Sequence, residues 1–234
     1  MSAVFRRELQ GYFHTAVGWV FMGVFLALAS VMCFVTILQA RSSDLLTFIG
    51  QMSYLWMLLS PVLTMRLLAE ERRSRTDQLL LTSPVSLTGV VLGKYFAAVC
   101  VMLLTVLLTG LYPLLVAVYG RVYPGELFVG YLGFILQGCA FLAVDLFVSC
   151  LCSNAVTAAV AAFGCNLALW MMDLLEGSVP VWLDNVLSFL SLYSRNESFL
   201  MGQLSFASIV YDLSVAAAFL ALTVSAMDGR RYGR

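Results

Sequence analysis

The sequence predicts an all-α integral membrane protein with six transmembrane helices, and two observations carry that prediction. Of its 234 residues, 62% are apolar and only 11% are charged, whereas about a quarter of the residues of soluble globular proteins are charged. Six apolar runs are also long enough, at 18 or more residues, to cross a bilayer as helices that satisfy their own backbone hydrogen bonds. The expected spans are about 16–38, 49–69, 91–119, 127–150, 155–176 and 207–227. A chain of this length cannot bury six such helices in a soluble core.

Residues 2–14 precede the first span and predict an amphipathic helix that lies in the membrane interface. Its apolar face comprises Phe5, Leu9, Tyr12 and Phe13, and its polar face Arg6, Gln10 and His14. The run that follows is too long for the apolar region of a signal peptide, and no A-x-A-like site follows it. We therefore interpret it as a retained span.

Basic residues distribute unequally between the two sides of the predicted membrane. Six spans place both termini on one side, and that side carries ten of the 13 Lys and Arg residues. The opposite side carries Arg41, Arg121 and Arg195. Positive charge stays in the cytoplasm, so both termini and the segment between spans two and three are expected to be cytoplasmic. Arg66 and Lys94 lie just inside the ends of these spans and are interpreted as anchors that extend their charges to the head groups.

Residues 70–84, EERRSRTDQLLLTSP, form a compact charged segment between two apolar runs. Ser74 and Asp77 make a helix-start pattern, and Pro84 ends the short helix because it forces the preceding residue out of the helical region. Three leucines, at 79–81, follow one residue after the last charge. The pattern fits a solvated loop, and it fits equally well a short helix with an apolar end that docks in a groove of another protein.

Two other segments depart from simple spans. Pro113 lies near the outer end of span three, where a kink is tolerated if a neighbour satisfies the freed carbonyl. Within residues 177–206, Pro180 opens a stretch, VWLDNVLSFLSL, that has apolar residues at helical spacing but is too short to cross. We therefore expect 177–206 to form a re-entrant or interfacial segment that caps the outer side.

Few polar groups lie within the spans, and three of them are candidates for function: Asp145, Asn166 and Asp212. A carboxylate inside a membrane is a functional candidate because it is costly to keep there. Asp212 is expected near the outer end of its span, whereas Asp145 lies deeper. An interhelical hydrogen bond is the competing structural interpretation of Asp145.

The motifs of soluble chemistry are not found in the sequence. Residues 89–94, GVVLGK, are one residue short of a phosphate-binding loop, and Tyr95 replaces its hydroxyl residue. The spacing of Gly89 and Gly93 is better explained by close helix packing. The six cysteines lie in or beside apolar runs without a metal-ligand pattern, so neither a disulfide nor a metal is predicted.

Taken together, these segments resemble a known family. The sequence EERRSRTDQLLLTSPVS at 70–86, followed by LGK at 92–94, resembles the hallmark of ABC-2 type permeases. The sequence LSLYSRNESFLMGQLS at 190–205, with FLALTV at 219–224 and a basic tail, is similar to the gliding-motility branch of that family. The chain departs from the family pattern at Arg75, where glycine is usual, and at Gln78, where an acidic residue is usual.

The resemblance implies a single permease domain over 1–234 with the architecture of a type V ABC exporter. Two permease subunits, identical or different, would pair in the bacterial inner membrane. Each would dock on a cytosolic ATPase, which binds ATP and Mg²⁺, through a coupling helix at 70–84. The residues expected to couple to the ATPase are Glu70, Glu71, Arg72, Arg75, Thr76, Asp77, Leu79, Leu80 and Pro84. No cofactor bound by this chain and no nucleic acid are expected.

Three alternatives are weighed against an exporter permease. An intramembrane enzyme would need paired deep carboxylates or a histidine beside a nucleophile, and the single histidine is His14. A stand-alone secondary transporter or channel would be supported by related halves, which the sequence does not display. An ABC membrane subunit that relays ATP energy to an outer auxiliary protein without moving solute stays open, because residues 177–206 offer a contact surface.

Overall fold

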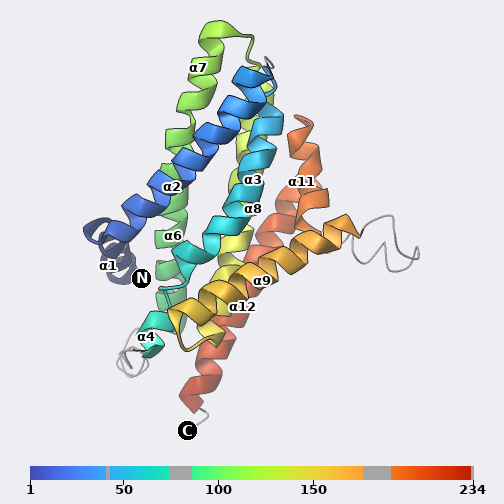
Figure 1. Ribbon diagram of the computed structural model, residues 1–234. Helices are drawn as coiled ribbons and strands as arrows, with labels where there is room; N and C mark the ends of the chain where they lie inside the picture. The colour runs from blue at the N-terminus through green and yellow to red at the C-terminus, as the bar shows by residue number, and fades with distance from the viewer. Residues whose placement is uncertain (41–42, 74–85, 176–190, 233–234) are drawn as a thin grey trace.

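The computed structural model describes residues 1–40, 43–73, 86–175 and 191–232, and every regular element in these ranges is a helix (Figure 1). Within these ranges, six helices are long and apolar enough to cross a membrane, in agreement with the predicted all-α class and number of spans. They cover Ala16–Gln39, Leu45–Thr64, Leu87–Val118, Pro124–Leu151, Ala155–Met172 and Phe206–Gly229.

The N-terminal helix α1 (Ser2–His14) has the bounds that its amphipathic pattern predicts. Its apolar face packs against protein: Tyr12 is buried, and Phe5, Leu9 and Phe13 contact the core. The helix lies along α6 (Leu87–Thr109), where a Cβ added to Gly93 would be 3.2 Å from the Cβ of Val4. The close packing expected at Gly93 is therefore confirmed, and the partner is α1.

Helix α2 (Ala16–Cys33) continues into a π-helical segment, η1 (Phe34–Gln39). The next helix, α3 (Leu45–Thr64), begins four residues before the expected start at 49. The cause is Asp44, whose side chain accepts hydrogen bonds from the backbone N–H groups of Leu46 and Thr47 and so caps the helix. Helix α3 also ends before the expected residue 69, at Thr64, and the short helix α4 (Ala69–Arg73) follows after a turn.

Span three consists of two helices, α6 and α7 (Leu111–Tyr119), that meet at Gly110. Pro113 has no N–H to donate to the carbonyl of Thr109, four residues earlier. The hydroxyl of Tyr131, on α8 (Pro124–Leu151), donates to that carbonyl at 3.2 Å. The neighbour that the sequence required at this proline is therefore present.

Helix α8 is the centre of the bundle. It packs against α3 and against the last helix, α12 (Phe206–Tyr232). Of the most apolar stretch of α8, 67% is buried inside the protein. The corresponding share for α9 (Ala155–Leu174) is 17%, so that helix lies at the periphery. The core next to α8 is aromatic: the indole of Trp56 on α3 makes edge contacts with Phe21, Phe25 and Phe134.

Part of the segment expected to cap the outer side is helix α11 (Leu192–Leu200); residues 176–190 lie outside the described residues. Helix α11 packs on α8 through two buried side chains. The amide of Asn196 donates to Gln137 Oε1 at 2.7 Å, and Phe199 covers Gly133. A Cβ added to Gly133 would be 2.6 Å from the Cβ of Phe199, so this close approach requires glycine.

Replacing Gly133 by alanine is therefore expected to lower the free energy of unfolding by about 1–3 kcal/mol, because the added methyl group pushes α11 away from α8. The matched control is Gly164→Ala on α9, where an added Cβ meets no atom within 4 Å. The control is expected to be neutral or slightly stabilising, since alanine favours a helix over glycine. Thermal unfolding in detergent measures both. Equal midpoints for the two variants would contradict the close packing of α11.

Candidate functional site at the end of helix α3

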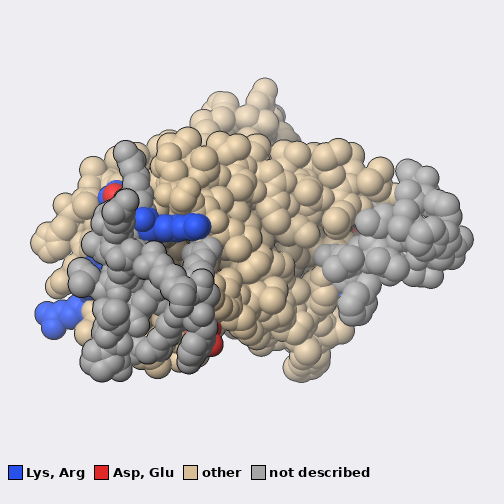
Figure 2. Space-filling view, turned by 90° about the horizontal axis from the view of Figure 1, so that it is seen from below, with Lys and Arg blue, Asp and Glu red and all other residues tan. Residues whose placement is uncertain are grey.

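Helix α4, the N-terminal end of α1 and the C-terminal end of α12 lie in the lower part of Figure 1, and α7 lies at the opposite end. Seen from below, most of the charged side chains of the described residues that are visible lie toward one side of the molecule (Figure 2). Glu70, Glu71 and Arg72, the first of the residues expected to couple to an ATPase, belong to α4. Arg75, Thr76, Asp77, Leu79, Leu80 and Pro84 lie outside the described residues.

Helix α4 is hydrogen-bonded to the C-terminal end of α8. The guanidinium of Arg72 donates to the carbonyl of Leu151 at 2.9 Å, which satisfies one of the carbonyls left open at the end of α8. The hydroxyl of Ser149 accepts from Ala69 N at 3.3 Å and donates to Met65 O at 3.4 Å. These hydrogen bonds link α4 and the turn before it directly to the end of α8.

The turn between α3 and α4 is also held from the other side, by Lys94 of α6. Its ammonium group donates to the carbonyl of Leu67 at 2.6 Å and forms an ion pair with Glu8 of α1 at 3.1 Å. Only 1% of the Lys94 side chain is exposed. The expectation that Lys94 extends to the lipid head groups is therefore wrong, because the folded chain supplies acceptors for its ammonium group inside the protein.

Glu8 and Tyr12 connect α1 to the same region. Burial acts to raise the pKa of Glu8, but the positive charges of Lys94 and Arg7 outweigh it and hold that pKa below its ordinary value. The hydroxyl of Tyr12 donates to Leu63 O at 2.7 Å, one of the last carbonyls of α3, and burial raises the pKa of Tyr12. Helix α1, the turn after α3, α6 and α8 thus form one hydrogen-bonded unit around the beginning of the 70–84 segment.

A second polar cluster lies deeper, where α3, α8 and α9 meet. The two oxygens of the Asp145 carboxyl group accept hydrogen bonds from Ser60 Oγ at 2.6 Å and from Asn166 Nδ2 at 2.9 Å. All three residues are fully buried. The structure therefore brings together two of the three intramembrane candidates, Asp145 and Asn166, and adds Ser60.

Pro61 explains why Asn166 lies at this point. Proline has no N–H, so the carbonyl of Met57, four residues earlier in α3, loses its helical donor. Asn166 Nδ2 donates to that carbonyl at 3.2 Å. A backbone carbonyl without a hydrogen-bond donor is costly inside a membrane protein. A single amide from α9 therefore supplies the donor that the α3 carbonyl lacks and also binds Asp145 of α8.

The third candidate, Asp212, does not join this cluster. It lies on α12 with only 2% of its surface exposed, and neither carboxyl oxygen has a hydrogen-bond partner among the described residues. The described part of the chain also contains no group of three or more His, Cys, Asp or Glu side chains able to hold a metal ion.

Sequence reasoning missed Lys94, Glu8, Tyr12, Ser60 and Ser149 as members of these clusters. One signal was present in the sequence. Pro61 lies within an apolar span and leaves the carbonyl of Met57 without its helical donor, which predicts a polar side chain from another helix at that point. The contacts of Lys94 had no such signal, because they depend on α1 folding back along α6.

Two comparisons with known proteins bear on this arrangement. A comparison with individual curated proteins finds no match. The family model described as ABC-2 family transporter protein matches residues 45–227, which include α3, α4, the Asp145 cluster and most of α12. That match spans most of the chain, so the protein belongs to the ABC-2 transporter family.

Proposed function

We propose that this chain is the permease subunit of an ABC exporter and that a separate cytosolic ATPase drives it through residues 70–84. Family membership supports the coarser part of this statement, a membrane-embedded transport subunit that works with an ABC ATPase. The chain itself is not expected to hydrolyse ATP; ATP and Mg²⁺ would bind to the partner.

The observation that carries the coupling proposal is the attachment of α4. Helix α4, which holds the first residues of the 70–84 segment, is bonded to the end of α8 through Arg72 and through Ala69, whose N–H donates to Ser149. Lys94 connects the preceding turn to α6 and α1. A force that reaches α4 would therefore be passed to several helices. The Asp145 cluster would extend the connection, since it links α3 to α8 and α9 next to Pro61.

The remaining parts of the proposal rest on sequence. Two permease subunits would pair, with both termini and the coupling segment in the cytoplasm of a bacterium, because basic residues concentrate on that side of the spans. The motifs at 190–205 and 219–224 support a place in the gliding-motility branch. Export is favoured over import by the type V architecture that the family resemblance implies.

Replacing both Leu79 and Leu80 by aspartate is expected to abolish co-purification of the ATPase, with at least about a tenfold loss of bound partner, because two charges would enter an apolar docking contact. The measurement is a mild-detergent pull-down of the tagged permease with quantitative mass spectrometry of the Walker-motif protein. The control, Leu79→Ile with Leu80→Ile, keeps the apolar character and is expected to retain the partner. An undiminished ATPase signal in the aspartate variant would rule out docking through these leucines.

A further inference from the structure

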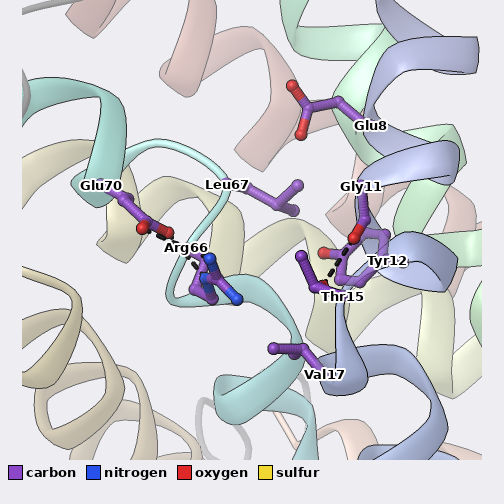
Figure 3. A pocket seen from close by; sticks show the side chains of 8 residues that line it. All are labelled: Glu8, Gly11, Tyr12, Thr15, Val17, Arg66, Leu67 and Glu70. Carbon is purple, nitrogen blue, oxygen red and sulfur yellow. Dashed lines mark hydrogen bonds and ion pairs between the residues drawn. The ribbon is translucent and has the colours of Figure 1, made fainter.

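A cavity of about 130 Å³ lies between α1, the start of α2 and the turn after α3 (Figure 3). Its walls include the side chains of Glu8, Tyr12, Thr15 and Arg66. One water molecule needs only about 10–15 Å³ of such space, so the cavity has room for a larger polar group. Neither the fold nor the coupling proposal uses it.

Two oppositely charged side chains on the cavity walls, Arg66 and Glu8, each have one polar atom open to a ligand. The guanidinium of Arg66 donates through Nε and Nη2 to Glu70, at 2.6 and 3.3 Å, while its Nη1 has no hydrogen-bond partner among the described residues. The carboxylate of Glu8 accepts from Lys94 and Arg7 through Oε1, while its Oε2 has no such partner. Arg66 and Glu8 do not pair with each other, and Figure 3 places Leu67 between them.

The cavity lies at the level expected for the membrane surface. It is bounded by the end of an amphipathic helix and by the first residues of a membrane-crossing helix. Trp19, two residues beyond the cavity wall at Val17, is 61% exposed and donates from its indole N–H to Phe13 O at 3.1 Å. Exposed tryptophan at the start of a span is typical of the interface between head groups and hydrocarbon.

We propose that this cavity binds the head group of an aminophospholipid, with the phosphate at Arg66 and the primary ammonium at Glu8. Arginine binds phosphate through charge-assisted N–H groups, and an ammonium N–H donates to the open carboxylate oxygen. Glu8 and Glu70 outnumber Arg66 on the walls, which disfavours a ligand with negative charge alone. A trimethylammonium group has no N–H to donate, so phosphatidylcholine fits less well than phosphatidylethanolamine.

The test is native mass spectrometry of the full-length protein, released from nanodiscs that contain equal amounts of phosphatidylethanolamine, phosphatidylcholine and phosphatidylglycerol. We expect phosphatidylethanolamine to be retained about tenfold more than either other lipid, as one lost charge-assisted hydrogen bond predicts. Equal retention of the three lipids, or preference for phosphatidylglycerol, would overturn the proposal. Displacement of the lipid by soluble glycerophosphoethanolamine at equal concentration would overturn the assignment to a lipid.

Gly11→Leu supplies a variant that fills the cavity without disturbing the fold. Gly11 lines the cavity, and an added Cβ there meets no atom within 4 Å. Leucine also favours a helix over glycine, so the variant should keep its thermal unfolding midpoint and lose the selective retention of phosphatidylethanolamine. The matched control is Gly23→Leu on α2, which is equally open and outside the cavity. Retention of the lipid by Gly11→Leu would exclude this cavity as its site.

Arg66→Lys separates the phosphate contact from the internal ion pair. Lysine keeps a charge for Glu70 but has no second nitrogen to aim into the cavity. We expect the unfolding midpoint to stay near that of the unmodified protein and retention of phosphatidylethanolamine to fall several-fold. Unchanged retention would contradict the role given to Nη1.

Discussion

Replacement of Asn166 by leucine is expected to lower the free energy of unfolding by about 2 kcal/mol, more than most interhelical hydrogen bonds in membranes contribute, which average about 0.6 kcal/mol. The larger figure follows because one substitution leaves two buried acceptors without their donor, the carbonyl of Met57 and Asp145 Oδ1. Helix α9 is little buried elsewhere, so these bonds are a large share of what holds it to α3 and α8. Thermal unfolding in detergent measures the loss.

The control for Asn166→Leu is Thr157→Leu on the same helix, because that hydroxyl is exposed and donates only to Asn154 O within the first turn. It is expected to change the unfolding midpoint little. A double variant, Asn166→Leu with Asp145→Leu, tests the mechanism: it removes one of the stranded acceptors and should be less destabilised than the sum of the two single changes. Additive losses would mean that the two side chains do not act on each other.

The six spans and the amphipathic N-terminal helix were predictable because each depends on its own residues. A run of 18 or more apolar residues crosses a bilayer whatever its neighbours are, and the pattern of residues 2–14 predicts a helix from one segment alone. The start of α3 was also encoded locally, by Asp44, but this cap lies outside the apolar run from which the span at 49–69 was predicted. Its end at Thr64 was not predicted: Pro61 lies inside the helix, and a turn then leads into α4.

The clusters were less predictable because they join residues far apart in the chain. Asp145 was identified as a candidate by its depth alone, whereas its partners Ser60 and Asn166 come from two other helices. The apolar face of α1 predicted a helix in the membrane interface; in the structure Tyr12 of that face is buried, and Phe5, Leu9 and Phe13 contact the protein core. Periodicity specifies which face of a helix is apolar, but it does not specify whether protein or hydrocarbon lies against that face.

The second large effect is expected at Lys94. Replacing it by methionine should lower the free energy of unfolding by about 2 kcal/mol, because the carbonyl of Leu67 loses its donor and Glu8 loses one of its two cations. The turn before α4 would then be held on the α8 side only. If the 70–84 segment couples to an ATPase, the rate of ATP hydrolysis by the purified complex should fall to that of the ATPase without the permease. Arg6→Met, which removes an exposed charge from α1, is the control and should leave both measurements unchanged.

Lys94→Arg distinguishes the buried contact from the anchoring role that the sequence alone favours. An anchor at the head groups accepts arginine readily, since both side chains place a cation on a long apolar stem. The site in the structure has no such tolerance: the side chain is 1% exposed, and its ammonium is 2.6 Å from the carbonyl of Leu67, beside the close contact of Gly93 with α1. The larger, planar guanidinium cannot occupy that space without displacing α1. Arginine should therefore lower the unfolding midpoint nearly as much as methionine does. An unchanged midpoint for Lys94→Arg would instead support an anchor at the membrane surface.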